Sequence, residues 1–284
     1  MALPPAFLAL LSAACFGGAL IVVHFGLVHA STHGAARISL STTTGLMWLL
    51  APFFLDLTAW HLGAAAIFAI VGLFYPAAVT VITYESNRLL GPTLTGSISS
   101  CSPLFATAFA VMILGERLTA GGITGCVVIV AALALMSWQP QAGVPLGWRL
   151  LLPIAGAAVR ALAQTLGKLG LNLWPSPFAA TLIGYTVSGA AIWAMPRRSE
   201  PRRRVRARAV AWFAAAGVLN GSALLLLYQA LKSGSVSVVA PLVALYPLFT
   251  ILFSAIFVRS EVLARRTLGG ALLAVAGVVL LVSG

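Results

Sequence analysis

Three polar side chains in an otherwise apolar stretch are the residues best suited to chemistry in this sequence. Arg160, Gln164 and Lys168 follow one another at intervals of four, so a helix places them along one face. A guanidinium binds a carboxylate through two parallel hydrogen bonds, and a neighbouring amide can add a third. We expect this face to bind a carboxylate-bearing solute. A structural brace, in which Arg160 donates to backbone carbonyls, is the alternative.

Further polar and aromatic residues that interrupt apolar stretches are candidates for the same site. Ser99 stands between Thr95 and Ser102 at helical spacing, directly before a proline. Each candidate type also has an ordinary structural role: membrane Ser and Thr bond to their own helix, and Tyr or a lone His packs in a core. The expected substrate-binding residues are His24, Tyr75, Tyr84, Ser99, Arg160, Gln164, Asn220, Tyr228 and Tyr246.

Catalytic signatures do not accompany these residues. The sequence contains no G-x-S-x-G, H-E-x-x-H or G-x-x-x-x-G-K motif. His29 and His33 are four residues apart, but no carboxylate or cysteine stands near them, so a solvated loop is favoured over a metal site. We therefore expect no enzymatic activity, no cofactor and no metal.

The composition places the chain in a membrane. Hydrophobic residues make up 61% of the 284 residues and charged residues 8%, and the mean hydropathy is +1.04. Too little polar surface remains to cover a soluble globule of this length. The net charge of +12 comes from arginines between apolar stretches, which favours topology signals over nucleic-acid binding. The expected partners are the lipid bilayer and a small-molecule substrate, with no nucleic acid, and nothing indicates an oligomeric state.

Ten apolar stretches are long enough to cross the membrane, for which about 20 helical residues are needed. An all-α membrane protein with ten transmembrane helices is therefore predicted. The predicted spans are 6–28, 35–55, 62–84, 92–114, 119–138, 149–171, 176–195, 209–231, 236–257 and 266–283.

The chain also repeats itself. A shift of 144 residues aligns Pro103-Leu104-Phe105 with Pro247-Leu248-Phe249, and a shift of 145 aligns Glu116 with Glu261. Residues 1–140 and 141–284 are thus predicted to be two copies of five spans each. Because five is odd, the second copy must begin on the opposite side of the membrane. Such inverted repeats are typical of alternating-access carriers with a site at the repeat interface.

Two prolines occupy equivalent midspan positions in these copies. Pro103 and Pro247 each remove a backbone donor and free the carbonyl four residues earlier. Symmetric placement favours gating hinges, with a static kink as the alternative.

The repeated segment also carries a family resemblance. The "LGERLT" turn between a proline-containing helix and a glycine-containing apolar helix, duplicated in a ten-span chain, resembles the EamA-like branch of the drug/metabolite transporter superfamily. The second copy departs from it, with Arg259 and Ser260 before Glu261. Within that branch the chain is most similar to bacterial aromatic amino-acid exporters. The resemblance implies a small-metabolite carrier whose cavity is lined mainly by spans 1, 3, 4, 6, 8 and 9.

The acidic residues narrow the function. All five stand at or beyond span ends, so no midplane carboxylate is present for exchange between a proton and a lipophilic cation. Glu116 and Glu261 are expected to place negative charge near the first turn of the helix that follows each. The expected function is export of small metabolites, with amino acids, and among them aromatic ones, as the favoured substrates. The alternatives are a broad-specificity drug exporter of the same fold and a channel-like facilitator.

Basic residues predict the orientation. Thirteen arginines fall on the side of the loops after odd-numbered spans, whereas Arg117 and Lys232 fall on the other, with Lys168 near it. By the positive-inside bias the first side is cytoplasmic and both termini face out of the cell. We expect a multi-pass protein of the cell inner membrane.

Overall fold

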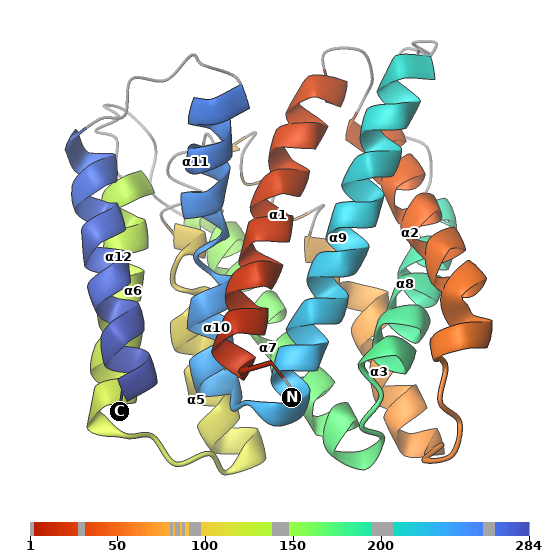
Figure 1. Ribbon diagram of the computed structural model, residues 1–284, viewed down its shortest axis with the longest axis horizontal. Coiled ribbons are helices and arrows are strands. Elements are labelled where there is room, and N and C mark those ends of the chain that lie inside the picture. Colours follow the sequence, from red (N-terminus) through yellow and green to blue (C-terminus); the bar gives the residue numbers. More distant parts are fainter. Residues whose placement is uncertain are drawn as a thin grey trace.

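The computed structural model describes residues 3–27, 32–79, 82, 86, 89–90, 98–137, 148–194, 207–257 and 265–283. Within these ranges the regular structure is helical and no strand occurs. The helices stand side by side in one bundle (Figure 1). They are α1 (Pro5–Leu27), α2 (Thr32–Phe54), α3 (Leu62–Phe74), α5 (Ser102–Leu114), α6 (Ala120–Ser137), η1 (Trp148–Leu150), α7 (Leu151–Leu173), α8 (Pro177–Ala194), α9 (Ala207–Ser233), α10 (Val236–Val243), α11 (Tyr246–Phe257) and α12 (Arg265–Ser283).

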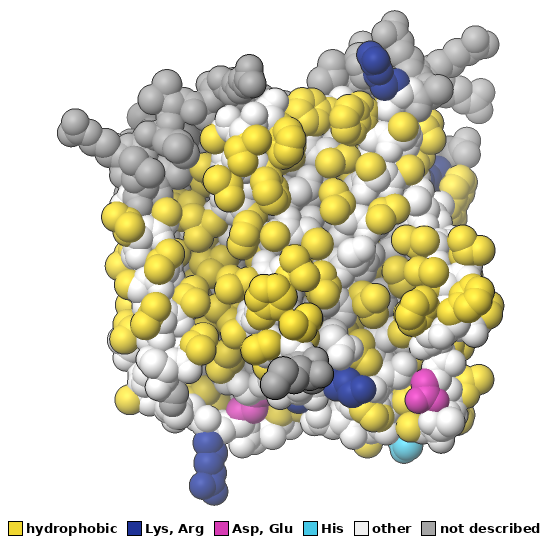
Figure 2. Space-filling model, in the orientation of Figure 1, with side chains coloured by type: hydrophobic (Ala, Val, Ile, Leu, Met, Phe, Trp, Pro, Cys, Tyr) yellow, Lys and Arg dark blue, Asp and Glu magenta, His cyan; other side chains and the backbone are white. Residues whose placement is uncertain are grey.

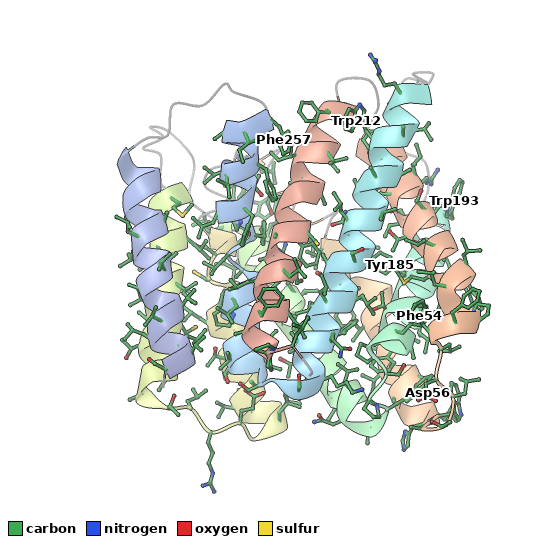
Figure 3. All side chains as sticks on the ribbon, viewed as in Figure 1. Phe54, Asp56, Tyr185, Trp193, Trp212 and Phe257 are labelled. Atoms are coloured by element: carbon green, nitrogen blue, oxygen red, sulfur yellow. The ribbon has the colours of Figure 1, made fainter. Side chains whose placement is uncertain are left out.

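The outer surface of the bundle suits a bilayer. Six of the described helical segments are long and apolar enough to cross a membrane. Apolar side chains cover the sides of the bundle, and the visible charged side chains gather at its two ends (Figure 2). Trp193 and Phe257, which are 57% and 66% exposed, lie on the outer surface (Figure 3). This is the arrangement of a multi-pass membrane protein.

Most of the predicted spans coincide with single helices, but three spans are interrupted. The first, second, fifth, sixth and seventh spans match α1, α2, α6, α7 and α8 to within three residues. In the third span, α3 ends at Phe74, before Pro76. In the fourth, a turn at residues 100–101 precedes α5, and in the ninth a turn separates α10 from α11. These interruptions all lie near the middle of a predicted span. The sequence did not predict them, because an uninterrupted apolar stretch favours a continuous helix.

Helices of each half pack on helices of the other half, and these contacts occur in equivalent pairs. In the first half α1 packs on α9 and on α11, and in the second half α7 packs on α3 and on α5. Likewise α2 packs on α9, whereas α8 packs on α3. If α1 corresponds to α7, α2 to α8, α3 to α9 and α5 to α11, each of these three contacts has its counterpart. The predicted repeat therefore has an equivalent in the packing.

Equivalent helices that meet each other run antiparallel. Across the contact of α2 with α8, the Trp48 indole donates to Thr186 Oγ1 at 3.1 Å, and the Trp193 indole donates to Ser41 Oγ at 3.1 Å. In each hydrogen bond a tryptophan near the end of one helix donates to a hydroxyl near the middle of the other. Such matching pairs form when two equivalent surfaces contact each other. Antiparallel packing of equivalent helices is the relation that an inverted repeat requires.

The helices α6 and α12 form a second antiparallel pair, which depends on glycine. A Cβ atom on Gly125 would lie 2.5 Å from the backbone nitrogen of Leu281, and one on Gly277 would lie 3.0 Å from the backbone nitrogen of Ile129. Small residues let two membrane helices approach closely enough for dispersion forces to hold them. The small residues of α6 and α12 therefore make this pair a packing element.

A dense core of buried apolar side chains lies toward the end of the bundle that carries both termini, which Figure 1 marks. There α1, α7, α9 and α10 bring together apolar side chains that are almost fully buried: Leu8, Leu171, Leu227, Leu231, Val236 and Val239. The Lys168 ammonium donates to the carbonyl of Leu231 at 2.6 Å and so joins α7 to α9 at this end.

Glu116 connects the two halves at the same end, and here the expectation from sequence was wrong. Its carboxylate accepts from the backbone N–H groups of Val236 at 2.7 Å and Ser237 at 3.0 Å. The charge therefore stabilises the first turn of α10 in the other half, not that of α6, because the loop before α6 passes beside the start of α10. Glu261 lies outside the described residues.

Candidate functional site

A cavity of about 380 Å³ lies at mid-depth between the halves, directly beyond the dense core. It has the size of a small-molecule pocket. Residues of α1, α7 and α9 contribute to it, together with the interrupted third, fourth and ninth spans. These are the six spans that the resemblance implied, with the addition of Leu133 from α6.

Most of the predicted site residues meet in this cavity. Six of the nine candidate substrate-binding residues line it, and so do both predicted hinge prolines: Tyr75, Ser99, Arg160, Gln164, Asn220, Tyr246, Pro103 and Pro247. Sequence reasoning missed other lining residues, among them Phe16, Leu20, Val79, Leu133, Val243 and Ala244. Those residues are apolar, and nothing in an apolar stretch distinguishes a side chain that faces a cavity from one that faces lipid.

The other three candidates do not contribute to the cavity as described. Tyr228 is 2% exposed and does not line it. A Cβ atom on Gly167 would lie 2.6 Å from the Tyr228 ring, so this tyrosine fills the contact of α7 with α9. His24 belongs to α1, but its side chain is not described, and Tyr84 lies outside the described residues.

Arg160 supplies the positive charge of the cavity. Its Nη1 donates a long hydrogen bond of 3.5 Å to Tyr246 Oη, and its Cζ lies 6.0 Å from the centre of the Tyr246 ring. Among the described lining residues there is no carboxylate. A guanidinium has five donors and cannot be neutralised at physiological pH. As far as the described residues go, most of its hydrogen-bonding capacity is thus available to a solute or to water in the cavity.

Two amides extend the polar side of the cavity. The side chains of Gln164, on α7, and Asn220, on α9, form no hydrogen bond to other described residues. Both can therefore donate to and accept from a bound molecule. Lys168 is different, because its ammonium donates to the Leu231 carbonyl. Of the polar face expected along α7, Arg160 and Gln164 therefore line the cavity, whereas Lys168 lies toward the end of the bundle.

The interruptions beside the two prolines share one hydrogen-bond pattern. Cys101 N–H donates to the Ile98 carbonyl at 3.1 Å, and Leu245 N–H donates to the Leu242 carbonyl at 3.2 Å. The next bonds also match, since Leu104 and Leu248 donate three residues back at 3.0 and 2.9 Å. All of these positions differ by 144 residues.

The two prolines stand at helix starts and not inside continuous helices. Pro103 is the second residue of α5, and Pro247 is the second residue of α11. Proline is favoured in a first turn because the backbone donor that it lacks has no partner there. The interpretation as interior kinks is therefore corrected, whereas a hinge role stays a prediction.

Fold and site together define a multi-pass membrane transporter: an apolar bundle that encloses a small polar cavity between two similarly packed halves. The model of the EamA-like transporter family matches the chain twice, over residues 3–138 and 147–283. The chain belongs to this family. Its members are transporters and not enzymes, so the protein is a membrane carrier of a metabolite or drug.

Solved structures confirm the fold. A structure described only as "Crystal structure of protein" superposes with a TM-score of 0.79 at 14% sequence identity, over 97% of this chain and 95% of the other. No curated protein matches the sequence. At this identity the structure is evidence for the fold alone, and the similarity to aromatic amino-acid exporters stays a prediction.

Proposed function

We propose that the protein exports small carboxylate-bearing metabolites across the cell inner membrane, with aromatic amino acids as the best substrates. Arg160 carries this proposal: a fixed cation faces a mid-depth cavity in which no described residue offers a carboxylate. A guanidinium near the centre of a span costs about 2.5–3.5 kcal/mol on insertion scales. A solute carboxylate offsets that cost through paired, charge-assisted hydrogen bonds.

The rest of the cavity wall suits an amino acid with an apolar side chain. Gln164 and Asn220 offer acceptors for an ammonium group, and Phe16, Tyr75 and Tyr246 offer aromatic surface. Aromatic faces also attract cations and stack on other rings. This combination favours aromatic amino acids over the lipophilic cations that a drug exporter would carry.

Alternating access between two inverted repeats is the proposed mechanism. The equivalent pairs of helix contacts and the antiparallel pairing of α2 with α8 support the inverted relation. The dense core separates the cavity from the end that carries the termini, so transport requires this core to part while the other end closes. A channel-like facilitator would need both ends open together.

The basic residues assign the two ends of the bundle to the two sides of the membrane. We assign the end with both termini to the outside of the cell, because Arg37, Arg149 and Arg208 belong to the opposite end and the sequence predicts most other arginines in loops on that side. In this assignment the described conformation is closed toward the outside.

Counterflow in reconstituted vesicles tests the proposal. Vesicles loaded with unlabelled phenylalanine should accumulate labelled phenylalanine transiently. The same experiment with an aliphatic amino acid should give a smaller accumulation, and with a quaternary ammonium it should give none. Equilibration without transient accumulation would indicate a pore. Preference for the quaternary ammonium would indicate the drug exporter.

Variants of Arg160 separate the two roles of the guanidinium. If Arg160 binds the substrate, Arg160→Gln should stay monodisperse and lose transport of carboxylates, while decarboxylated amine analogues are spared. If it is a brace, the same variant should lower the unfolding temperature and transport of all solutes. Arg149→Gln, which changes an arginine outside the cavity, is the matched control. Unimpaired amino-acid transport by well-folded Arg160→Leu would refute both roles.

A further inference from the structure

A second cavity, separate from the central one, opens at the end of the bundle that carries both termini. Its volume is about 470 Å³, and it shares no lining residue with the central cavity. The ends of α2 and α9, the loop between α7 and α8, and the first turn of α8 form its wall. The solute binding proposed for the central cavity does not account for the composition of this second cavity, which requires a separate explanation.

Opposite charges stand at the mouth of this second cavity. Asp56 follows the last turn of α2, and Lys232 belongs to the last turn of α9. In the described part of the chain the Lys232 ammonium has no hydrogen-bond or ion-pair partner. Gln229, one turn before it on α9, likewise presents an amide without a side-chain partner among the described residues.

Asp56 is ionised and only partly satisfied. Its Oδ1 accepts from the Thr58 backbone N–H at 2.9 Å and from the Thr58 hydroxyl at 2.6 Å. These hydrogen bonds, first from the side chain and then from the backbone of Thr58, hold the pKa of the Asp56 carboxyl below its usual value, and the charge of Lys232 acts in the same direction. Within the described residues, the other carboxylate oxygen is left for a ligand.

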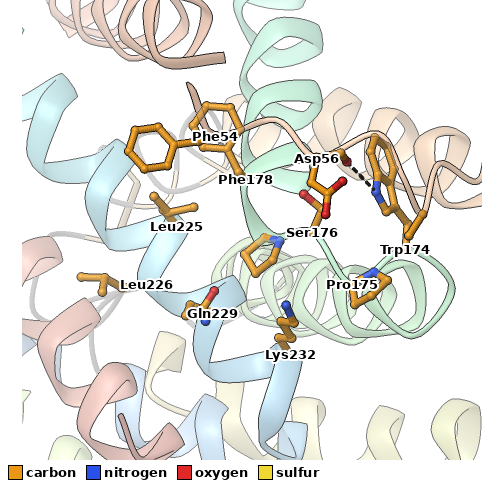
Figure 4. Close-up of a pocket in the computed structure, with 12 residues that line it drawn as sticks. Phe54, Asp56, Trp174, Pro175, Ser176, Phe178, Leu225, Leu226, Gln229 and Lys232 are labelled. Carbon is orange, nitrogen blue, oxygen red and sulfur yellow. Dashed lines mark hydrogen bonds between the residues drawn. The ribbon is translucent and has the colours of Figure 1, made fainter. Parts of the chain in front are cut away.

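Some apolar residues of the second cavity lie deeper along the bundle axis than the charged ones, whereas Trp174 and Pro175 lie beside the charges. Phe54 is the last residue of α2 and Asp56 lies beyond it, and Leu225 precedes Lys232 on α9 by seven residues, which is about 10 Å of helix. In Figure 4 the labelled Phe54, Phe178 and Leu225 lie together, away from Asp56 and Lys232. Phe54 is also 61% exposed on the outer surface. The cavity wall therefore mixes charged and apolar residues at the level where spans end and is apolar toward the bilayer core.

We propose that this cavity binds a phospholipid whose headgroup carries both a phosphodiester and a primary ammonium. The ammonium binds Asp56, the phosphate binds Lys232 and Gln229, and an acyl chain lies along Phe54 and Leu225. A primary ammonium can donate to a carboxylate, whereas the quaternary ammonium of a choline headgroup cannot. The depth gradient favours a lipid over a free zwitterion, since a free solute needs no apolar wall that continues to the outer surface.

Native mass spectrometry of the purified protein tests this assignment. After delipidation, equal amounts of phosphatidylethanolamine, phosphatidylcholine and phosphatidylglycerol of identical chains are added in detergent, and retained adducts are counted. The wild type should retain phosphatidylethanolamine over phosphatidylcholine by about tenfold, the ratio expected for one charge-assisted hydrogen bond. Equal retention of the three lipids would overturn the proposal.

Three variants locate the site. Asp56→Asn keeps the oxygen that accepts from Thr58, so the turn is preserved, but the preference for ethanolamine over choline should disappear. Lys232→Gln should lower retention of phosphatidylethanolamine and phosphatidylglycerol alike. Arg117→Gln, which removes an exposed charge at the same end outside the cavity, should change neither.

A competing ligand provides the remaining test. Free phenylalanine at millimolar concentration should leave the lipid adducts unchanged in the wild type. Displacement of the lipid by phenylalanine, lost in Asp56→Asn, would show that the second cavity is a solute site and would overturn the lipid assignment. Because the readout is lipid retention, the result does not depend on which solute the central cavity carries.

Discussion

The contact of Glu116 with the start of α10 provides the sharpest test of alternating access. Opening the end that carries the termini would separate the loop before α6 from α10, and both hydrogen bonds, of 2.7 and 3.0 Å, would break. A hydrogen bond to a charged group contributes about 1.5–3 kcal/mol. Because Glu116 is half-buried, we take the lower value. In Glu116→Gln the amide oxygen accepts from one N–H only, so the closed state should lose about 1.5 kcal/mol relative to the open state. That is roughly a tenfold shift of the equilibrium.

The assay measures access to the central cavity from the terminal end. In a background without Cys15, Cys101 and Cys126, Ser99→Cys places a thiol in the cavity wall. The rate of its reaction with an impermeant maleimide in intact cells should rise about tenfold when Glu116→Gln is added.

The neighbouring exposed charge supplies the control for this prediction. Arg117→Gln changes the charge of the same loop by one unit without touching α10, and it should leave the rate unchanged. An unchanged rate in Glu116→Gln, in a protein that still transports, would refute the view that this contact holds the outer end closed. A rise of equal size in Arg117→Gln would show that loop charge alone sets the rate.

Three further predictions follow from the packing and the repeat. Replacing Pro103 or Pro247 with alanine should extend the helix through the interruption and slow counterflow more than it weakens substrate binding; equal loss of both would contradict a hinge role. Gly125→Val should lower the unfolding temperature by several degrees because its side chain meets the backbone of α12, whereas Gly269→Ala, which meets no atom within 4 Å, should not. A cysteine at residue 202 should resist an impermeant thiol reagent in intact cells, and strong labelling would reverse the proposed orientation.

Much of the candidate site was predictable because polar residues are costly in a bilayer. Arg160, Gln164 and Asn220 stand in apolar spans, so each needs a cavity, a partner or a solute. The cavity wall contains all three. Tyr228 was misplaced because a tyrosine is stable both in a core and at a cavity, and only the close approach of Gly167 decides between the two.

The sequence alone determined the membrane class and the approximate bounds of several helices, and it predicted the repeat. Each depends on local composition, on the length of chain needed to cross the bilayer or on comparison of the chain with itself. The tertiary structure decided which helices meet and where each polar group is satisfied. Glu116 illustrates the difference: its charge suits any nearby helix start, and only the packing of the halves brings it to α10 instead of α6. The interruptions beside Pro103 and Pro247 illustrate the same difference. A proline is compatible with a kink inside a helix and with the first turn of a new helix. The structure shows that each proline stands in the first turn of a new helix, and that both of these turns line the cavity between the halves.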